Sequence, residues 1–274
     1  IAQEDSVALE QLKPQQGNPQ IDIAVIRMPH ISNFDDFDPL DKEKDIRVRY
    51  VNSIANLNHP DLIILPGSKT TIADLDWLKN NGLARRITEL YRQGVFVIGI
   101  CGGYQMLGAY INDPGQVESP VPSRQGLGLL PISTTFLSTK ETHQIKGNVT
   151  ANRGLLTEAR DVNFEGYEIH MGRTETDGGG DVFQIQERSG QSCDTLDGYM
   201  DDSGRVLGTY VHGLFHNQEI RQAVLRHIAD SKGQHLSFFD DDQREDEYDR
   251  LADLIRHNLN MNLIYAITGL RKGR

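Results

Sequence analysis

Apolar and polar positions along the first hundred residues predict β-strands separated by helices. Short runs rich in β-branched residues occupy 21–27 and 46–51, and two further runs are continuously apolar, 61–65 after its first residue Asp61 and 95–100 throughout. Runs that are apolar at every position are typical of parallel strands whose two faces are both buried. These segments therefore predict the strands of a mostly parallel sheet.

Helices are expected between and after these strands. A stripe of leucine and isoleucine over about 72–92 predicts a helical stretch that is broken at Asn81-Gly82, and a second helix is expected over 104–110. Alternation of strand and helix is typical of α/β proteins. The predicted fold class is therefore α/β, a doubly wound, mostly parallel sheet with flanking helices.

The second half of the chain follows a different pattern, in which glycine-rich turns separate short strands. Asp177-Gly-Gly-Gly-Asp181 is expected to be a loop, and 217–230 a helix. The strands expected in this half are 145–150, 166–171, 182–187 and 206–211.

Three regions follow from these patterns. Residues 1–20 are polar, with proline and glycine near their end, which favours a linker. Residues 21–235 are expected to form the main domain. Residues 236–274 begin with an acidic stretch and continue as a helix with one apolar side, so we expect a C-terminal helical extension packed on that domain.

Composition narrows the classes of function. The 274 residues carry a formal net charge of -11, and no block of Lys or Arg suggests a nucleic-acid-binding surface. Two cysteines, Cys101 and Cys193, make no disulfide framework, and no Cys-x-x-Cys pair suggests a metal site. Because neither a membrane span nor a signal peptide is recognisable, we expect a cytoplasmic protein with no membrane partner.

The segment Val97–Gly108 has the Gly-x-nucleophile-x-Gly pattern of a nucleophile elbow, with Cys101 at the nucleophile position. Such a turn leads from a buried strand into a helix and holds the nucleophile in a strained conformation. The helix N-terminus favours the thiolate, and the N–H of Gly102 is placed to bind an oxyanion. The alternative interpretation is a buried structural cysteine in an ordinary turn.

A cysteine nucleophile requires a base, and two histidines occur in or after predicted strands. His212 lies at the end of the strand 206–211, and strand ends are where sites form in α/β sheets. His170, within the strand 166–171, is the second candidate. We predict His212 as the base.

The segment 66–71, Pro-Gly-Ser-Lys-Thr-Thr, is loosely similar to a phosphate-binding P-loop. A P-loop requires a glycine four residues before its Gly-Lys-Ser/Thr, and the chain lacks it here. We therefore interpret the turn as a second source of oxyanion N–H groups, with Gly67 and Ser68 facing Cys101. A plain strand-to-helix turn is the alternative.

The segment Gly99–Gln105, Gly-Ile-Cys-Gly-Gly-Tyr-Gln, resembles the core of class I glutamine amidotransferase domains. In that family a G-x-C-x-G-x-Q elbow carries the nucleophile, and a later histidine completes the site. The resemblance covers about 21–265 and implies a flavodoxin-like fold. Four further stretches are similar to the cobyric acid synthase branch of the family, namely 31–40, 65–71, 166–174 and 209–215.

The resemblance implies that the chain hydrolyses glutamine, with Cys101 as nucleophile and His212 as general base and acid. The oxyanion and glutamine contacts that it implies are Gly67, Ser68, Gly102 and Gln105.

The resemblance also implies a partner. In cobyric acid synthases, ammonia passes to an N-terminal, ATP-dependent synthetase domain. That domain amidates the b, d, e and g carboxylates of the corrinoid adenosylcobyrinic acid a,c-diamide in cobalamin biosynthesis. Residues 4–9 resemble the end of that domain, so 1–20 are expected to be its tail or a linker, and the chain its C-terminal amidotransferase part. We expect no cofactor in this chain, and ATP and Mg in the synthetase domain.

The chain departs from the class I pattern at one position. The usual triad has a glutamate two residues after the histidine, where this chain has Leu214. The cobyric acid synthase branch lacks that glutamate, so we expect a Cys–His dyad or an acid from elsewhere. Glu168 is our candidate for the accessory acid, with His170 as a further accessory residue. The alternative for Glu168 is an exposed strand residue.

Other functions remain open. One is the related synthase that makes cobyrinic acid a,c-diamide, but the stretches 33–40 and 166–174 favour cobyric acid synthase. Another is the glutaminase partner of a peptidoglycan-amidating ligase. A non-catalytic module of the same fold would be favoured by loss of Cys101 or His212, and both are present. A peptidase of similar fold is disfavoured by Gln105.

Overall fold

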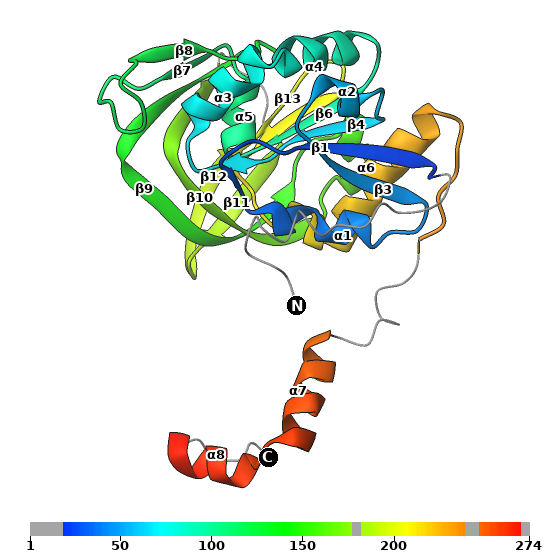
Figure 1. The fold of residues 1–274 in the computed structure, drawn as a ribbon, viewed down its shortest axis with the longest axis vertical. Helices are drawn as coiled ribbons and strands as arrows, with labels where there is room; N and C mark the ends of the chain where they lie inside the picture. Colours follow the sequence, from blue (N-terminus) through cyan, green and yellow to red (C-terminus); the bar gives the residue numbers. More distant parts are fainter. Residues whose placement is uncertain (1–18, 177–181, 239–246, 270–274) are drawn as a thin grey trace. The chain divides into compact units, whose positions relative to one another are not determined.

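The fold is taken from a computed structural model (Figure 1), which describes residues 19–176, 182–238 and 247–269. The strands are β1 (Ile21–Ile26), β2 (Ile31–Ser32), β3 (Ile46–Val51), β4 (Leu62–Leu65), β5 (Gly67–Ser68), β6 (Phe96–Ile100), β7 (Tyr110–Asn112), β8 (Ser123–Gln125), β9 (Ile132–Val149), β10 (Asn163–Thr176), β11 (Phe183–Arg188), β12 (Gln191–Asp197), β13 (Tyr199–Met200) and β14 (Val206–Thr209). The helices are α1 (Asp38–Asp41), α2 (Ile54–Leu57), α3 (Thr71–Asn80), α4 (Leu83–Arg92), α5 (Gly102–Leu107), α6 (Gln218–Ser231), α7 (Glu247–Asn258) and α8 (Met261–Thr268), with 3₁₀ turns η2 (Phe34–Phe37), η3 (Gly154–Ala159) and η4 (Leu214–His216).

One sheet has the strand order β13-β14-β6-β4-β1-β3. All of its neighbours pair in parallel except β13 and β14. The strands β4 and β6 are buried at every position, as their continuous apolar sequences predict. The predicted α/β class with a mostly parallel sheet is confirmed. Because β4, β6 and β14 run in the same direction, their C-terminal ends meet at one edge of the sheet.

Helices cover both faces of this sheet (Figure 1). Apolar side chains of α3, α4 and α5 join one core cluster with the inner residues of β4 and β6. Those of α1, η3 and α6 join a second cluster on the opposite face. The helical stretch expected over 72–92 is two helices, α3 and α4, because Gly82 takes a left-handed conformation with φ 74° between them.

A second, largely antiparallel sheet contains β12, β11, β9, β7 and β8 in that order, with β10 paired to β9. The strands expected at 145–150 and 166–171 are parts of the longer β9 and β10. Most of residues 137–144 are exposed polar positions, so their pattern resembles a loop more than a strand. The expected loop at 177–181 lies outside the described residues.

The two sheets meet beside the C-terminal edge of the parallel sheet. Tyr167, in the middle of β10, forms an isolated antiparallel bridge with His212, three residues after β14. The second sheet therefore passes over the edge where the predicted nucleophile and base lie.

The helices α7 and α8 belong to a compact unit separate from the one that contains the two sheets. Docking of 236–274 onto the main domain therefore stays a prediction, as does the linker at 1–20, of which 1–18 lie outside the described residues. In the described part of the chain, no helix has both the length and the apolar content needed to cross a bilayer.

Candidate active site

Cys101 lies where β6 ends and α5 begins, at the turn that the elbow pattern predicts. Its backbone has φ 54° and ψ -109°, a conformation that is strained for a residue with a Cβ. The Cys101 N–H donates to Thr209 O at 2.8 Å, which ties the elbow to the end of β14. The thiol lies 3.4 Å from the carbonyl oxygen of Ile169 on β10.

Two glycines allow α5 to approach the sheet closely. A Cβ on Gly103 would lie 1.9 Å from Leu65 O, and a Cβ on Gly99 would lie 2.7 Å from the Gly103 carbonyl carbon. No side chain fits at either position. Because Gly102 is the first residue of α5, its N–H has no acceptor within the helix.

The strand β5 brings further N–H groups beside the elbow. A Cβ on Gly102 would lie 3.0 Å from Ser68 N, and a Cβ on Gly67 would lie 3.3 Å from His212 Cε1. The Ser68 hydroxyl donates to Asp74 Oδ2 at 2.7 Å, which anchors the side chain to α3. The three residues predicted for the oxyanion therefore lie together, and their role in binding it stays a prediction.

His212 is fully buried and makes a short contact with a carboxylate that the sequence pattern did not single out. Its Nδ1 lies 2.7 Å from Asp36 Oδ2, and the Gly213 N–H donates to Asp36 Oδ1 at 2.8 Å. Asp36 belongs to η2, 176 positions before His212. The only signal in the sequence was the resemblance of the stretch 31–40 to the amidotransferase family.

The Asp36 carboxylate determines the charge of His212. Burial by itself lowers the pKa of His212, but Asp36 and the Cys101 thiol outweigh burial and raise this pKa to about 10. The imidazole is therefore protonated at neutral pH. No hydrogen bond of normal geometry joins His212 Nε2 to a described residue, so Nε2 is the nitrogen left for Cys101.

Glu168, the acid predicted from the sequence, has different partners, so that prediction needs correction. Its carboxylate lies 2.7 Å from Arg188 Nε and 3.8 Å from His170 Nε2. Side chains alternate along a strand, and the preceding residue, Tyr167, stacks on His212. Glu168 therefore points to the other face of β10, and the carboxylate against His212 is the one from η2.

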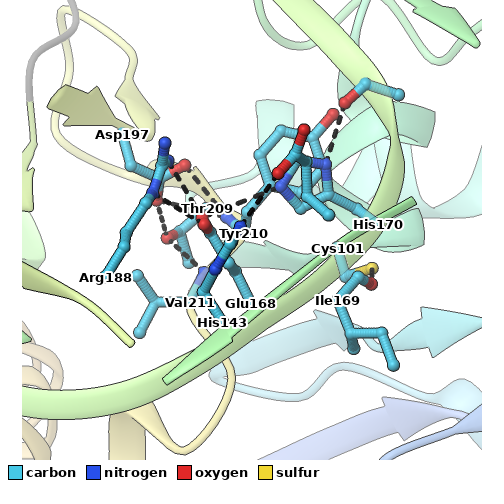
Figure 2. Close-up of polar contacts among 12 residues, drawn as sticks. Cys101, His143, Glu168, Ile169, His170, Arg188, Asp197, Thr209, Tyr210 and Val211 are labelled. Atoms are coloured by element: carbon cyan, nitrogen blue, oxygen red, sulfur yellow. Dashed lines mark hydrogen bonds and ion pairs between the residues drawn. The ribbon is translucent and has the colours of Figure 1, made fainter. Parts of the chain in front are cut away.

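A cavity of about 560 Å³ adjoins this second cluster. In Figure 2, Glu168 and Arg188 gather on one side, while Cys101 lies beside Ile169. His170 stacks on Tyr210 with ring centroids 3.9 Å apart and donates from Nδ1 to Gly172 O at 2.9 Å. The polar residues in the cavity wall include Tyr104, Glu168, His170, Arg188, Asp197 and Tyr210. Within the described ranges, no group of three or more His, Cys, Asp or Glu side chains is arranged to hold a metal ion.

Gln105, predicted to contact glutamine, is buried behind the elbow. Its carboxamide accepts a hydrogen bond from Thr71 Oγ1 and donates one to the Tyr210 hydroxyl, each at 3.2 Å. Both ends of the amide are therefore engaged in bracing α5 against its neighbours. A direct contact with substrate stays a prediction.

Solved structures of similar fold include PurLQS from Thermotoga maritima, with a TM-score of 0.58 at 19% identity, covering 77% of this chain and 100% of that one. A protein of Thermoplasma acidophilum described as a GMP synthase subunit gives a TM-score of 0.51 at 16% identity, covering 78% of this chain and 96% of that one. At these identities the likeness concerns the fold alone.

Comparison of sequences identifies the family more specifically than comparison of folds does. The chain is 46% identical over 270 residues to a cobyric acid synthase from Dehalococcoides mccartyi, covering 97% of this chain and 53% of that protein. It is 41% identical over 271 residues to a cobyric acid synthase from a Thermoanaerobacter species, covering 96% and 53% respectively. The chain thus spans about half the length of the curated relatives it matches. The profile of the CobB/CobQ-like glutamine amidotransferase domain matches residues 22–220. The chain belongs to this CobB/CobQ-like family of glutamine amidotransferase domains.

Proposed function

We propose that this chain is the glutaminase domain of a cobyric acid synthase and hydrolyses glutamine through Cys101 and His212. The observation that carries the proposal is a cysteine at a strained elbow whose side chain interacts with that of His212, a histidine that Asp36 orients. This is the arrangement that an activated thiol nucleophile requires. The 46% identity to a cobyric acid synthase supports the biosynthetic assignment.

The first step is attack of the Cys101 thiolate on the side-chain carboxamide carbon of glutamine. The imidazolium of His212 supplies the positive charge that favours a thiolate beside it. As the S–C bond forms, the carbonyl oxygen becomes an oxyanion, which the N–H groups of Ser68 and Gly102 would bind. Donors of this kind stabilise the transition state by about 3–4 kcal/mol each in comparable sites.

His212 then transfers its Nε2 proton to the departing nitrogen. The C–N bond breaks, ammonia leaves, and a thioester remains on Cys101. The neutral imidazole next takes a proton from water, whose oxygen attacks the thioester, and the S–C bond breaks to release glutamate. Asp36 holds Nδ1 in both steps, so Nε2 keeps its orientation.

The ammonia is proposed to serve an ATP-dependent synthetase. The chain spans about half of its cobyric acid synthase relatives, so the other half is the natural recipient. We assign to that half the amidation of the b, d, e and g carboxylates of adenosylcobyrinic acid a,c-diamide, together with ATP and Mg. On this basis the chain acts in cobalamin biosynthesis in the cytoplasm.

The test is ammonia release from glutamine by the whole chain, with and without a separately expressed synthetase domain of a cobyric acid synthase. Cys101→Ala is compared with Cys193→Ala, which changes the other cysteine, on the partly exposed β12. We expect release to vanish in Cys101→Ala, to persist in Cys193→Ala, and to rise with the synthetase domain. Equal release by wild type and Cys101→Ala would refute the mechanism.

A further inference from the structure

Tyr167 contacts both the backbone and the ring of His212. The Tyr167 N–H donates to His212 O at 3.2 Å, and the His212 N–H donates to Tyr167 O at 2.8 Å. The two rings stack with centroids 5.0 Å apart and planes 13° apart. The imidazole is therefore held on one face by an aromatic ring and at its edge by Asp36.

Asn33 holds this tyrosine from the segment that also carries Asp36. Its Nδ2 donates to the Tyr167 hydroxyl oxygen at 2.7 Å. Asn33 stands at the N-terminus of η2 in a left-handed conformation, φ 52° and ψ 42°, and its side chain makes no capping bond to that turn. Asparagine tolerates this conformation better than most residues, and here its amide is committed to Tyr167.

The ring of Tyr167 has the right charge to stabilise a protonated histidine. Burial and the negative charge of Asp36 hold the pKa of Tyr167 above its usual range, so the phenol stays neutral. The face of a neutral aromatic ring attracts a cation and also keeps water away from it. With Nδ1 bound to Asp36, the stack limits rotation of the His212 ring.

We propose that Tyr167 is a positioning residue that keeps His212 protonated and aims its Nε2 at Cys101, and that Asn33 acts through Tyr167. This inference rests on the proposed function, because it assigns the two residues a part in the glutaminase reaction. The segment 31–40 then acts on the His212 ring through two residues. Asp36 binds the edge of the imidazole, and Asn33 binds the hydroxyl of Tyr167, whose ring lies over the face of the imidazole.

The experiment measures glutamine hydrolysis against pH in Tyr167→Phe, Tyr167→Leu, Asn33→Gly and the double variant Tyr167→Phe/Asn33→Gly. Glycine retains the left-handed backbone, so Asn33→Gly removes only the amide. Two matched control variants change a tyrosine and an asparagine that make no described hydrogen bond to His212 or Tyr167. Tyr50→Phe removes a hydroxyl that donates to Phe34 O in the same segment, and Asn58→Gly changes another asparagine of positive φ.

We expect kcat to fall about tenfold or more in Tyr167→Leu and only about threefold in Tyr167→Phe, with KM within about twofold of wild type. Asn33→Gly is expected to match Tyr167→Phe, and the double variant to be no worse than either single variant, because both remove one interaction. Both controls are expected to behave as wild type. A wild-type rate and pH profile in a folded Tyr167→Leu would overturn the proposal, as would additive losses in the double variant.

A second readout does not depend on turnover. The titration of His212 is followed by NMR of histidine-labelled protein in the Cys101→Ala background, with and without Tyr167→Leu. We expect the midpoint to fall by about one pH unit when the ring is removed. An unchanged midpoint would contradict the positioning role. Ammonia release that persists in Cys101→Ala would instead refute the proposed function and leave this titration valid.

Discussion

Two of the carboxylate–histidine pairs in the described residues lie on opposite faces of β10, and they differ in what the carboxylate does. Asp36 meets His212 at 2.7 Å with both side chains almost fully buried. Glu168 lies 3.8 Å from His170 and 2.7 Å from Arg188. In the first pair the carboxylate orients an imidazole beside a thiol. In the second it neutralises a guanidinium in a cavity wall.

The comparison shows that a carboxylate near a histidine is not enough to form a catalytic pair. What distinguishes the first pair is that no arginine is paired with Asp36 in the described contacts, so its charge acts on the imidazole. The pKa of Glu168 is affected most by burial, which raises it, but His170 and Arg188 together hold it below its usual range. A carboxylate that is already paired with an arginine, as Glu168 is, therefore acts less strongly on a nearby histidine than an unpaired carboxylate does.

The largest effect is expected from Asp36→Asn, which removes the charge that orients His212. We expect ammonia release to fall by about 10⁴-fold, the loss seen when the acid of a catalytic histidine becomes an amide. The matched control is Asp35→Asn, the adjacent residue of the same 3₁₀ turn, for which we expect a change within about threefold. Equal losses in the two variants would contradict a specific role for Asp36.

The second prediction concerns stability against pH. The pKa of His212 is raised from 6.5 to about 10 in the folded state, so its contribution is complete below pH 6.5 and is lost as the pH rises to about 10. Within that window stability falls by up to about 1.4 kcal/mol for each pH unit. Urea unfolding of wild type and Asp36→Asn between pH 7 and 9.5 checks this. A difference between them that does not shrink with rising pH would speak against the raised pKa.

A smaller effect is expected when the cation of the second pair is removed. Arg188→Gln leaves the buried Glu168 carboxylate without its guanidinium, and we expect a loss of about 1–2 kcal/mol because Arg188 is itself partly exposed. Arg173→Gln, at an exposed position of β10, is the control, with a change within about 0.5 kcal/mol. Urea denaturation of both variants measures the difference, and equal stabilities would indicate that Arg188 does not stabilise Glu168.

The smallest effect on catalysis is expected from Glu168→Gln. Its carboxylate belongs to the pair away from Cys101, so ammonia release by the folded variant should stay within about threefold of wild type. This variant is assayed beside Asp36→Asn under identical conditions. A loss of activity as large as that of Asp36→Asn would show that Glu168 takes part in the reaction, and would contradict the distinction between the two carboxylate–histidine pairs.

Those features of the fold and site that depend on local sequence pattern could be predicted from the sequence. Cys101 sits between two glycines after an apolar strand, so the strand, the turn and the following helix could be inferred together. The end of a strand also marked His212. The break at Asn81-Gly82 was visible because it interrupts a helical stripe.

The carboxylate that contacts His212, Asp36, could not be identified from local sequence pattern. Asp35, Asp36 and Asp38 lie in one short segment, and nothing in their spacing says which one turns inward. That choice depends on where η2 lies against the end of β14, a tertiary relation. The long β9 was also missed, because its exposed middle carries polar residues on both sides of the strand, where period-two alternation gives no signal.

The contact between Asp36 and His212 also bears on how the chain folds. It joins residues 176 positions apart, so forming it closes a long loop at a cost in chain entropy, and it requires β14 to be docked in the parallel sheet. Any partly folded chain in which β14 has not docked holds Cys101 away from His212, the residue that we propose as its base. During synthesis the proposed base is therefore absent until residue 212 has left the ribosome, and we expect the recovery of glutaminase activity after denaturation to require the docking of that strand.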